Sequence, residues 1–140
     1  MSETMNDVTF NKIAIVGAGA IGGWLGVHLA RLDSGARAQL SVLARGDTLS
    51  ALQQQGLQLH QGGELHTVPV NASNDAAALG VQDLVVISVK APALASVAAQ
   101  VGPLIGPKTV VLTAMNGVPW WFLQGFGGPV AGRSLGTVDP

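Results

Sequence analysis

The feature that most constrains the fold is a cluster of glycines between a strand-like and a helix-like segment. Residues 12–16 (KIAIV) form a β-branched run too short for a helix, and Gly17, Gly19 and Gly22 follow it directly. From Ala20 onward, apolar residues recur with helical spacing at Ile21, Leu25, Leu29 and Leu32. A strand, a tight turn and a helix in this order predict the first unit of an α/β fold.

The later segments continue the same alternation. We expect buried strands at 38–44, 83–90 and 108–117, helices at 47–56 and from 91 until Pro103 ends the second, and a hairpin over 56–70. This order predicts a doubly wound parallel sheet of the Rossmann type. Residues 1–11 are expected to fray and residues 12–140 to form one domain. The elements are too few for a complete sheet of this class, so we expect a truncated domain.

The glycine cluster matches the dinucleotide-binding pattern G-x-G-x-x-G, formed by Gly17, Ala18, Gly19, Ala20, Ile21 and Gly22. The first glycine permits a tight turn, the second lets a pyrophosphate approach the backbone, and the third lets helix and strand pack closely. The positive end of the helix dipole then favours the anion. The alternative is that these glycines serve only packing between helix and sheet, to which Gly26 would add.

Arg45 indicates which dinucleotide is bound. It follows the expected second strand, 23 residues after Gly22, where NAD-binding proteins usually place an acidic residue for the ribose 2′-hydroxyl. A guanidinium suits the 2′-phosphate of NADP instead. Arg45 could also be a solvated loop residue, and Asp47 could serve NAD, although its position is more typical of a helix N-cap. The pattern favours NADP.

Lys90 and Asn116 each stand at the carboxyl end of an expected strand. Ligands of open α/β sheets bind in the crevice outside these strand ends. Lysine can pair with a phosphate, and an asparagine amide can bond both a ribose hydroxyl and a substrate group. A solvent-facing lysine and an Asn-Gly turn explain the same positions equally well on spacing alone.

Composition argues against several other partners. The net charge of −1 leaves no electrostatic footprint for nucleic acid, and the absence of cysteine excludes disulfides and thiol chemistry. Residues 13–30 are uncharged, but their five glycines and His28 make a poor membrane span. No secretory signal pattern opens the chain, so a cytoplasmic location is expected.

The histidines and hydroxyl residues do not form a recognisable centre. In the expected hairpin His60 faces Leu65 and His66 faces Leu59, so the two imidazoles point to opposite faces and no metal site is expected. His28 fits a packing or surface role, and Ser88 and Thr113 lack the partners of a nucleophile. The Trp120-Trp121-Phe122 segment is either core or a surface that meets a partner domain, and we favour the surface.

Four segments give a more specific indication. KIAIVGAGAIGGWLG, LARG, DLVVISVKA and NGV occur in an order and spacing that resemble the ketopantoate reductase (2-dehydropantoate 2-reductase) family, over nearly all of residues 12–118. The resemblance implies that Gly17 to Gly22 bind the NADP pyrophosphate and that Arg45 meets the 2′-phosphate. It also implies that Lys90 contacts the cofactor and that Asn116 contacts both nicotinamide ribose and substrate.

The resemblance implies an activity as well. The family reduces the 2-keto group of 2-dehydropantoate by hydride transfer from NADPH, a step toward pantothenate. Its general-acid lysine and the carboxylate partner lie on a helical C-terminal domain to which nothing here corresponds. We therefore expect no catalytic residue in this chain, and coenzyme binding without turnover. A non-catalytic dinucleotide-binding module, or a reductase of another small substrate, is the alternative, and homo-oligomerisation stays open.

Overall fold

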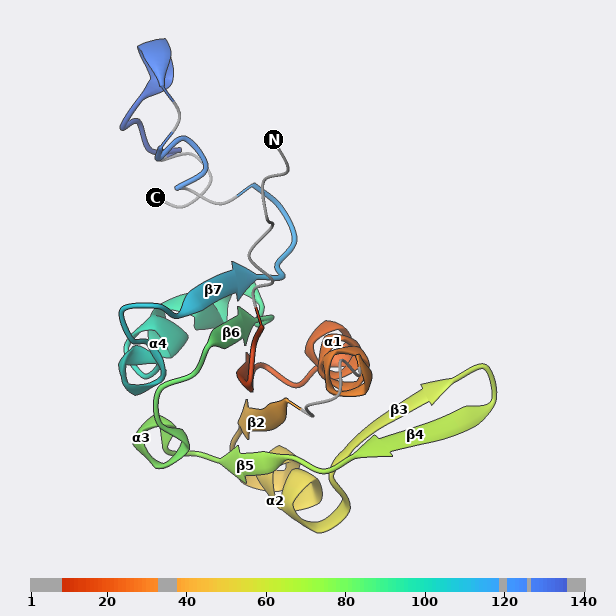
Figure 1. Cartoon of the computed structure of the whole chain (residues 1–140). Helices are drawn as coiled ribbons and strands as arrows, with labels where there is room; N and C mark the ends of the chain where they lie inside the picture. The colour runs from red at the N-terminus through yellow and green to blue at the C-terminus, as the bar shows by residue number, and fades with distance from the viewer. Residues whose placement is uncertain (1–8, 33–37, 119–120, 126, 136–140) are drawn as a thin grey trace, which may run out of the picture.

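Five parallel strands form the sheet around which the chain is organised (Figure 1). The computed structural model describes residues 9–32, 38–118, 121–125 and 127–135. The spatial order is β5-β2-β1-β6-β7, with β1 (Lys12–Val16) in the centre, β2 (Gln39–Leu43) and β5 (Asn71–Ser73) on one side, and β6 (Leu84–Ile87) and β7 (Val110–Thr113) on the other. The order reverses between β1 and β6. The predicted doubly wound parallel sheet is thereby confirmed.

Helices cover both faces of this sheet. Helix α1 (Ala20–Arg31) lies on one face, and α3 (Ala76–Leu79) and α4 (Leu94–Ala98) lie on the other (Figure 1). Alternate residues of the strands therefore enter two apolar clusters, and β1 contributes Ile13 and Ile15 to the first and Ala14 and Val16 to the second. The central strands are buried on both faces, as the continuous apolar runs predict.

The buried side of α1 differs from the predicted one. The buried residues are Gly22, Gly23, Gly26 and Val27, whereas Ile21 and Leu32 are 58% and 71% exposed. Leu25 and Leu29 pack at the margin of the first cluster. The prediction was only partly right because it followed apolar side chains, while three of the four buried residues of this helix are glycines.

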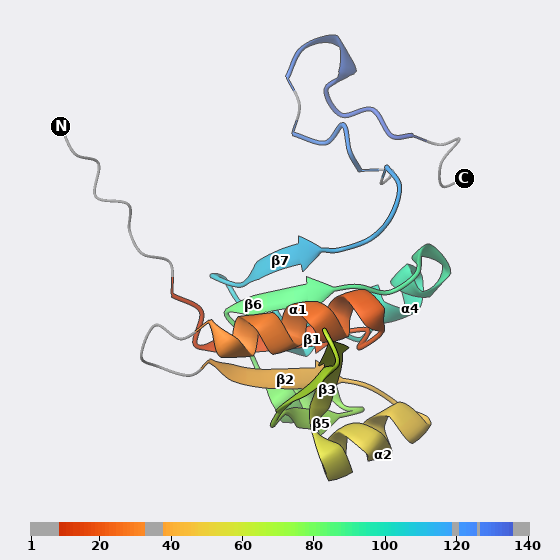
Figure 2. The ribbon, with the colours of Figure 1, turned by 90° about the vertical axis from the view of Figure 1, so that its right-hand side faces the viewer.

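The connection from β2 to β5 consists of helix α2 (Gly46–Gln55) and a hairpin. The hairpin strands β3 (Leu57–Gln61) and β4 (Glu64–Val68) pair antiparallel around Gly62-Gly63, and the hairpin projects beyond the sheet (Figures 1 and 2). Its register pairs His60 with Leu65 and Leu59 with His66, as predicted. Asp47 is not the N-cap of α2, since Arg45 holds that position and Asp47 lies in the first turn.

The second half of the chain contains short elements that the sequence did not indicate. Strand β5 and helix α3 occupy the polar, alanine-rich stretch before β6, and the side chain of Asp75 caps α3 by accepting a bond from the Ala77 N–H at 2.9 Å. The expected helix from residue 91 divides into 3₁₀ turns at 91–93 and 102–104 around α4. A last 3₁₀ turn lies at Gly128–Val130, beyond the sheet (Figure 2).

Strand β7 was predicted to be buried, and this prediction is wrong. It lies at the edge of the sheet, and Val110, Val111 and Leu112 are each between 43% and 46% exposed. Val110 and Leu112 stand in register with Leu84 and Val86, which point toward the α1 side. None of the described helices covers these side chains, so an apolar strand composition did not translate into burial.

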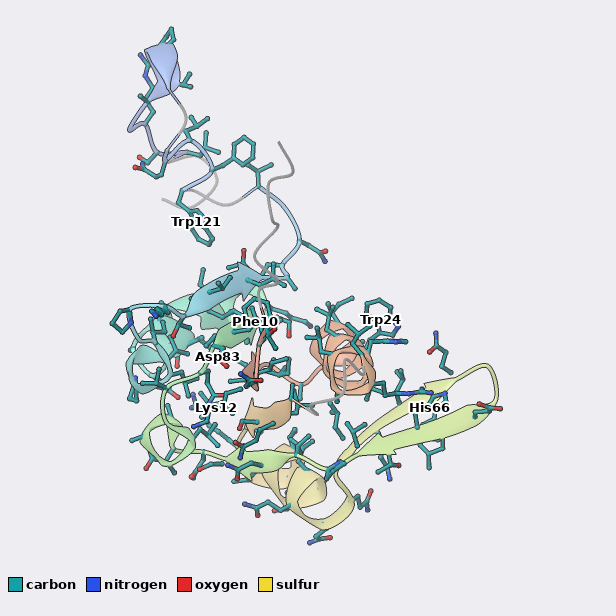
Figure 3. All side chains as sticks on the ribbon, viewed as in Figure 1. Phe10, Lys12, Trp24, His66, Asp83 and Trp121 are labelled. Atoms are coloured by element: carbon teal, nitrogen blue, oxygen red, sulfur yellow. The ribbon has the colours of Figure 1, made fainter. Side chains whose placement is uncertain are left out.

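A carboxylate joins the amino-terminal ends of β1 and β6. Asp83 Oδ2 accepts hydrogen bonds from the backbone N–H groups of Asn11 and Lys12 at 2.8 and 2.9 Å, and the Asp83 N–H donates to the Lys12 carbonyl at 2.8 Å (Figure 3). Phe10 packs against the first cluster nearby. Residues 1–8 of the segment expected to fray lie outside the described residues, whereas Phe10 and Asn11 contact the folded domain.

Removing this carboxylate should destabilise the domain. We expect Asp83→Ala to lower the free energy of unfolding by about 2 kcal/mol, because two charge-assisted hydrogen bonds are lost. Chemical denaturation followed by circular dichroism measures the change. Asp47→Ala removes an exposed carboxylate from the first turn of α2 and is the matched control, with an expected loss of about 0.5 kcal/mol. Equal losses in the two variants would contradict a role for Asp83 in joining the strands.

No described helix is both long and apolar enough to cross a bilayer.

Candidate dinucleotide-binding site

The glycine loop leaves β1 through a conformation that favours glycine. Gly17 has φ of +92°, and a Cβ there would lie 2.8 Å from Val89 Cγ1 and 3.0 Å from the Ser88 carbonyl oxygen. A side chain is therefore excluded both by backbone strain and by the two residues that follow β6. This is the tight turn that the first glycine of the motif was predicted to provide.

The other two motif glycines serve different purposes. A Cβ at Gly22 would collide with the Gly17 carbonyl oxygen and with Ser88 Oγ, so this glycine is needed for close packing of α1 against β1 and β6. A Cβ at Gly19 would meet no heavy atom within 4 Å. Nothing in the described protein requires glycine at position 19. The open space in front of Gly19 is where a pyrophosphate could approach the protein backbone.

Ser88 holds the loop in place. Its Oγ donates a hydrogen bond to the Gly17 carbonyl oxygen at 2.6 Å, and its backbone N–H donates to the Val16 carbonyl oxygen at 2.9 Å. This structural role of Ser88 was not predicted from the sequence, in which Ser88 was considered only as a nucleophile. The signal in the sequence that could have indicated this role is a small polar residue directly after a buried strand.

A cleft of about 430 Å³ opens beside the glycine loop. It lies at the carboxyl ends of β1 and β2, next to the point where the strand order reverses. The end of β2, the start of α2 and one side of α4 form its other walls, with lining residues Val16, Gly17, Ala18, Gly19, Leu43, Ala44, Arg45, Thr48, Val89, Ala93, Val97 and Gln100. An elongated ligand with a charged group beside the glycines fits this combination of apolar walls and a helix N-terminus.

Arg45 lines the same cleft as the glycine loop. Its side chain is exposed, and its Nη2 donates a hydrogen bond to Gln100 Oε1 at 2.8 Å. Thr48 lines the same end of the cleft from the first turn of α2. The structure thus places Arg45 and the loop from Gly17 to Gly19 in one cleft, while Thr48 and Gln100 are lining residues that the sequence analysis did not name.

Lys90 and Asn116 stand at the carboxyl ends of the neighbouring strands β6 and β7, and both are exposed. Neither lines the cleft of about 430 Å³, and Gly117 after Asn116 has φ of +86°, as expected for an Asn-Gly turn. Their strand positions agree with the sequence analysis, but the structure does not bring them into contact with Arg45.

The histidines do not gather into a centre. Within the described ranges, no three His, Asp or Glu side chains are arranged to hold a metal ion. His66 approaches Glu64 at 3.8 Å on the hairpin, and the His28 ring lies against Trp24 in a tilted arrangement with 4.5 Å between centroids; Figure 3 labels His66 and Trp24. In the tail, Trp121 is half-buried and Phe122 is 48% exposed, while Trp120 lies outside the described residues.

Most of this chain, and not only the cleft, is similar to a known protein family. Residues 13–119 match the model of the family described as ketopantoate reductase PanE/ApbA. The chain belongs to the ketopantoate reductase family. Its resemblance to that family, expected from the glycine loop and the three following segments, is thereby confirmed.

Individual ketopantoate reductases match almost the whole chain. A 2-dehydropantoate 2-reductase from Mesorhizobium japonicum is 48% identical over 129 residues, which are 92% of this chain and 39% of the relative. The crystal structure of a chain described as a ketopantoate reductase from Ralstonia solanacearum MolK2 is 57% identical with a TM-score of 0.83, covering 94% of this chain and 40% of that one. The chain therefore spans about two fifths of the length of these relatives.

A structure with a bound coenzyme is also similar. The ternary structure of D-mandelate dehydrogenase with NADH and anilino(oxo)acetate is 27% identical with a TM-score of 0.65, covering 76% of this chain and 34% of that one. The fold is thus shared with an enzyme whose structure contains a nicotinamide coenzyme.

Proposed function

We propose that this chain is the coenzyme-binding part of an NADPH-dependent reductase that acts on a 2-keto acid, with 2-dehydropantoate as the substrate. The observation that carries the proposal is the cleft lined by the glycine loop and Arg45. The space beside Gly19 is free of atoms from the described residues, whereas Gly22 is packed tightly against its neighbours. Family membership and the 2-dehydropantoate 2-reductase relative support the substrate.

We assign each group of residues in the cleft to one part of the NADPH molecule. The loop from Gly17 to Gly19 and the start of α1 receive the pyrophosphate, since the helix dipole favours negative charge there. The apolar surfaces of Ala93 and Val97 on the α4 side receive the adenosine. Arg45 receives the 2′-phosphate, for which a guanidinium is well suited. NADH, the coenzyme in the D-mandelate dehydrogenase structure, lacks this phosphate.

The nicotinamide end extends toward the strand ends of β6 and β7. We assign Lys90 to a contact with the coenzyme and Asn116 to the nicotinamide ribose and the substrate, because Lys90 follows β6, which lies beside β1, and Asn116 follows β7, which lies beside β6. An amide has the donor and acceptor needed to bond two groups at once.

The reduction needs a proton as well as a hydride. A nicotinamide coenzyme, when bound, supplies the hydride to the keto carbon, and the carbonyl oxygen must then take a proton from an acid. Among the described residues assigned to the site, Arg45 does not give up its proton because it is a guanidinium, and Lys90 at the nicotinamide end is assigned to the coenzyme. We therefore assign the proton donor to residues outside these 140, so that this chain alone binds NADPH without oxidising it.

Calorimetric titration and an absorbance assay test these assignments on the chain itself. We expect tighter binding of NADPH than of NADH, and no loss of NADPH absorbance when 2-dehydropantoate is added. Oxidation of NADPH under these conditions would overturn the assignment of the proton donor. Equal binding of both coenzymes would overturn the preference for NADPH. A folded chain that binds neither coenzyme would overturn the site.

A further inference from the structure

The side chain that determines the proposed coenzyme preference has a partner from a distant part of the chain. Arg45 follows β2, whereas Gln100, which accepts its hydrogen bond at 2.8 Å, follows α4. Both residues line the cleft. A long, exposed arginine would otherwise sample many rotamers, so this bond reduces the number of positions open to the guanidinium.

Gln100 is itself fixed by its own neighbours. Its Nε2 donates to Ser96 Oγ at 3.1 Å, one turn earlier, and its backbone N–H donates to the Val97 carbonyl oxygen at 2.9 Å. The side chain is half-buried. With the amide nitrogen engaged by Ser96, the amide oxygen is the group directed at Arg45, so the acceptor is held in place before any ligand arrives.

We propose that Gln100 is a positioning residue that determines preference for a coenzyme with a 2′-phosphate, and this rests on the proposed function of Arg45. A neutral amide orients the guanidinium without cancelling its charge, and it occupies one of the five N–H donors. The remaining donors stay available for a phosphate. A carboxylate at the same position would pair with Arg45 and repel the phosphate, which would favour the 2′-hydroxyl of NADH instead.

The alternative is that Gln100 competes with the ligand for Arg45. A hydrogen bond from a guanidinium to a neutral amide is weaker than one to a phosphate, so a ligand phosphate can displace it. The two roles predict opposite changes in NADPH affinity when the side chain of Gln100 is removed. If Gln100 positions Arg45, removing its side chain weakens NADPH binding, and if Gln100 competes, removing it strengthens NADPH binding.

The experiment measures the Kd of NADPH and of NADH for the wild-type chain, Gln100→Ala and Gln100→Glu. We expect Gln100→Ala to reduce the preference for NADPH by about threefold to tenfold through its NADPH affinity alone, since one long side chain must then be ordered on binding. We expect Gln100→Glu to reduce the preference by more than about tenfold. Gln58→Glu, on β3 outside the cleft, introduces the same charge and should leave the ratio unchanged.

The ratio separates positioning from a general effect on folding, because a destabilised chain loses affinity for both coenzymes alike. An unchanged ratio in both Gln100 variants, or tighter NADPH binding by Gln100→Ala, would overturn the proposal while leaving the site intact. A wild-type chain that does not prefer NADPH would overturn this proposal together with the assignment of Arg45.

Discussion

Gly22→Ala should lower the free energy of unfolding by about 3 kcal/mol or more, which is a large part of the stability of a domain of this size. The added methyl group would collide with the Gly17 carbonyl oxygen and Ser88 Oγ. The carbonyl belongs to the backbone of a constrained turn, so relief requires α1 to move away from β1 and β6. Chemical denaturation followed by circular dichroism measures this loss directly.

Gly19→Ala is the matched control for this prediction, because the same atom is added three residues away. A methyl group there meets open space and Gly19 has an ordinary extended conformation at the N-cap, so the free energy of unfolding should change by less than about 1 kcal/mol. NADPH affinity should instead fall by roughly 100-fold, since the methyl group occupies the space assigned to the pyrophosphate. A stable Gly19→Ala variant with wild-type affinity would contradict the placement of the pyrophosphate.

Arg45→Ala should weaken NADPH binding by about 2 kcal/mol, roughly 30-fold, and leave NADH binding nearly unchanged. The guanidinium is exposed in the free chain, so the effect belongs at the lower end of the range for charged hydrogen bonds. The preference of the wild-type chain for NADPH should also decrease as salt is raised, because an exposed charge is screened. Isothermal titration calorimetry at two salt concentrations measures both quantities.

Arg31→Ala, at the end of α1, provides the control because it removes the same charge outside the cleft between the glycine loop and Arg45. It should change neither affinity. Arg45→Lys keeps the charge but loses the planar donor fork, so we expect an NADPH affinity between those of wild type and Arg45→Ala. Equal losses of NADPH and NADH affinity in Arg45→Ala would show that Arg45 supports the cleft rather than the 2′-phosphate.

The sequence predicted the parts of this molecule that depend on short stretches of chain. The strand, glycine turn and helix at residues 12–31 follow from local spacing, and the hairpin register follows from the two glycines at its turn. The positions of Arg45, Lys90 and Asn116 after their strands follow from the same local rules. What each of them binds is not a local property and stays a proposal.

The remaining features depend on what lies beside each element. An apolar strand such as β7 is buried only if other elements cover it, and its composition does not tell whether they do. Three of the four buried residues of α1 are glycines, which carry no hydrophobic signal. The contact between Arg45 and Gln100 joins residues 55 positions apart, and no local pattern at either residue indicates the other.

The hairpin limits the size of one residue of α1, and this constraint is independent of coenzyme binding. A Cβ at Gly26 would lie 2.7 Å from Leu57 Cδ2 on β3, and the next contacts, with Ile15 and Leu40 of the sheet, are ordinary ones. Position 26 is therefore constrained chiefly by the size of residue 57. A smaller residue at position 57 would therefore permit alanine at 26, whereas a Cβ at Gly17 or Gly22 would also meet a backbone carbonyl oxygen, which no side-chain substitution removes.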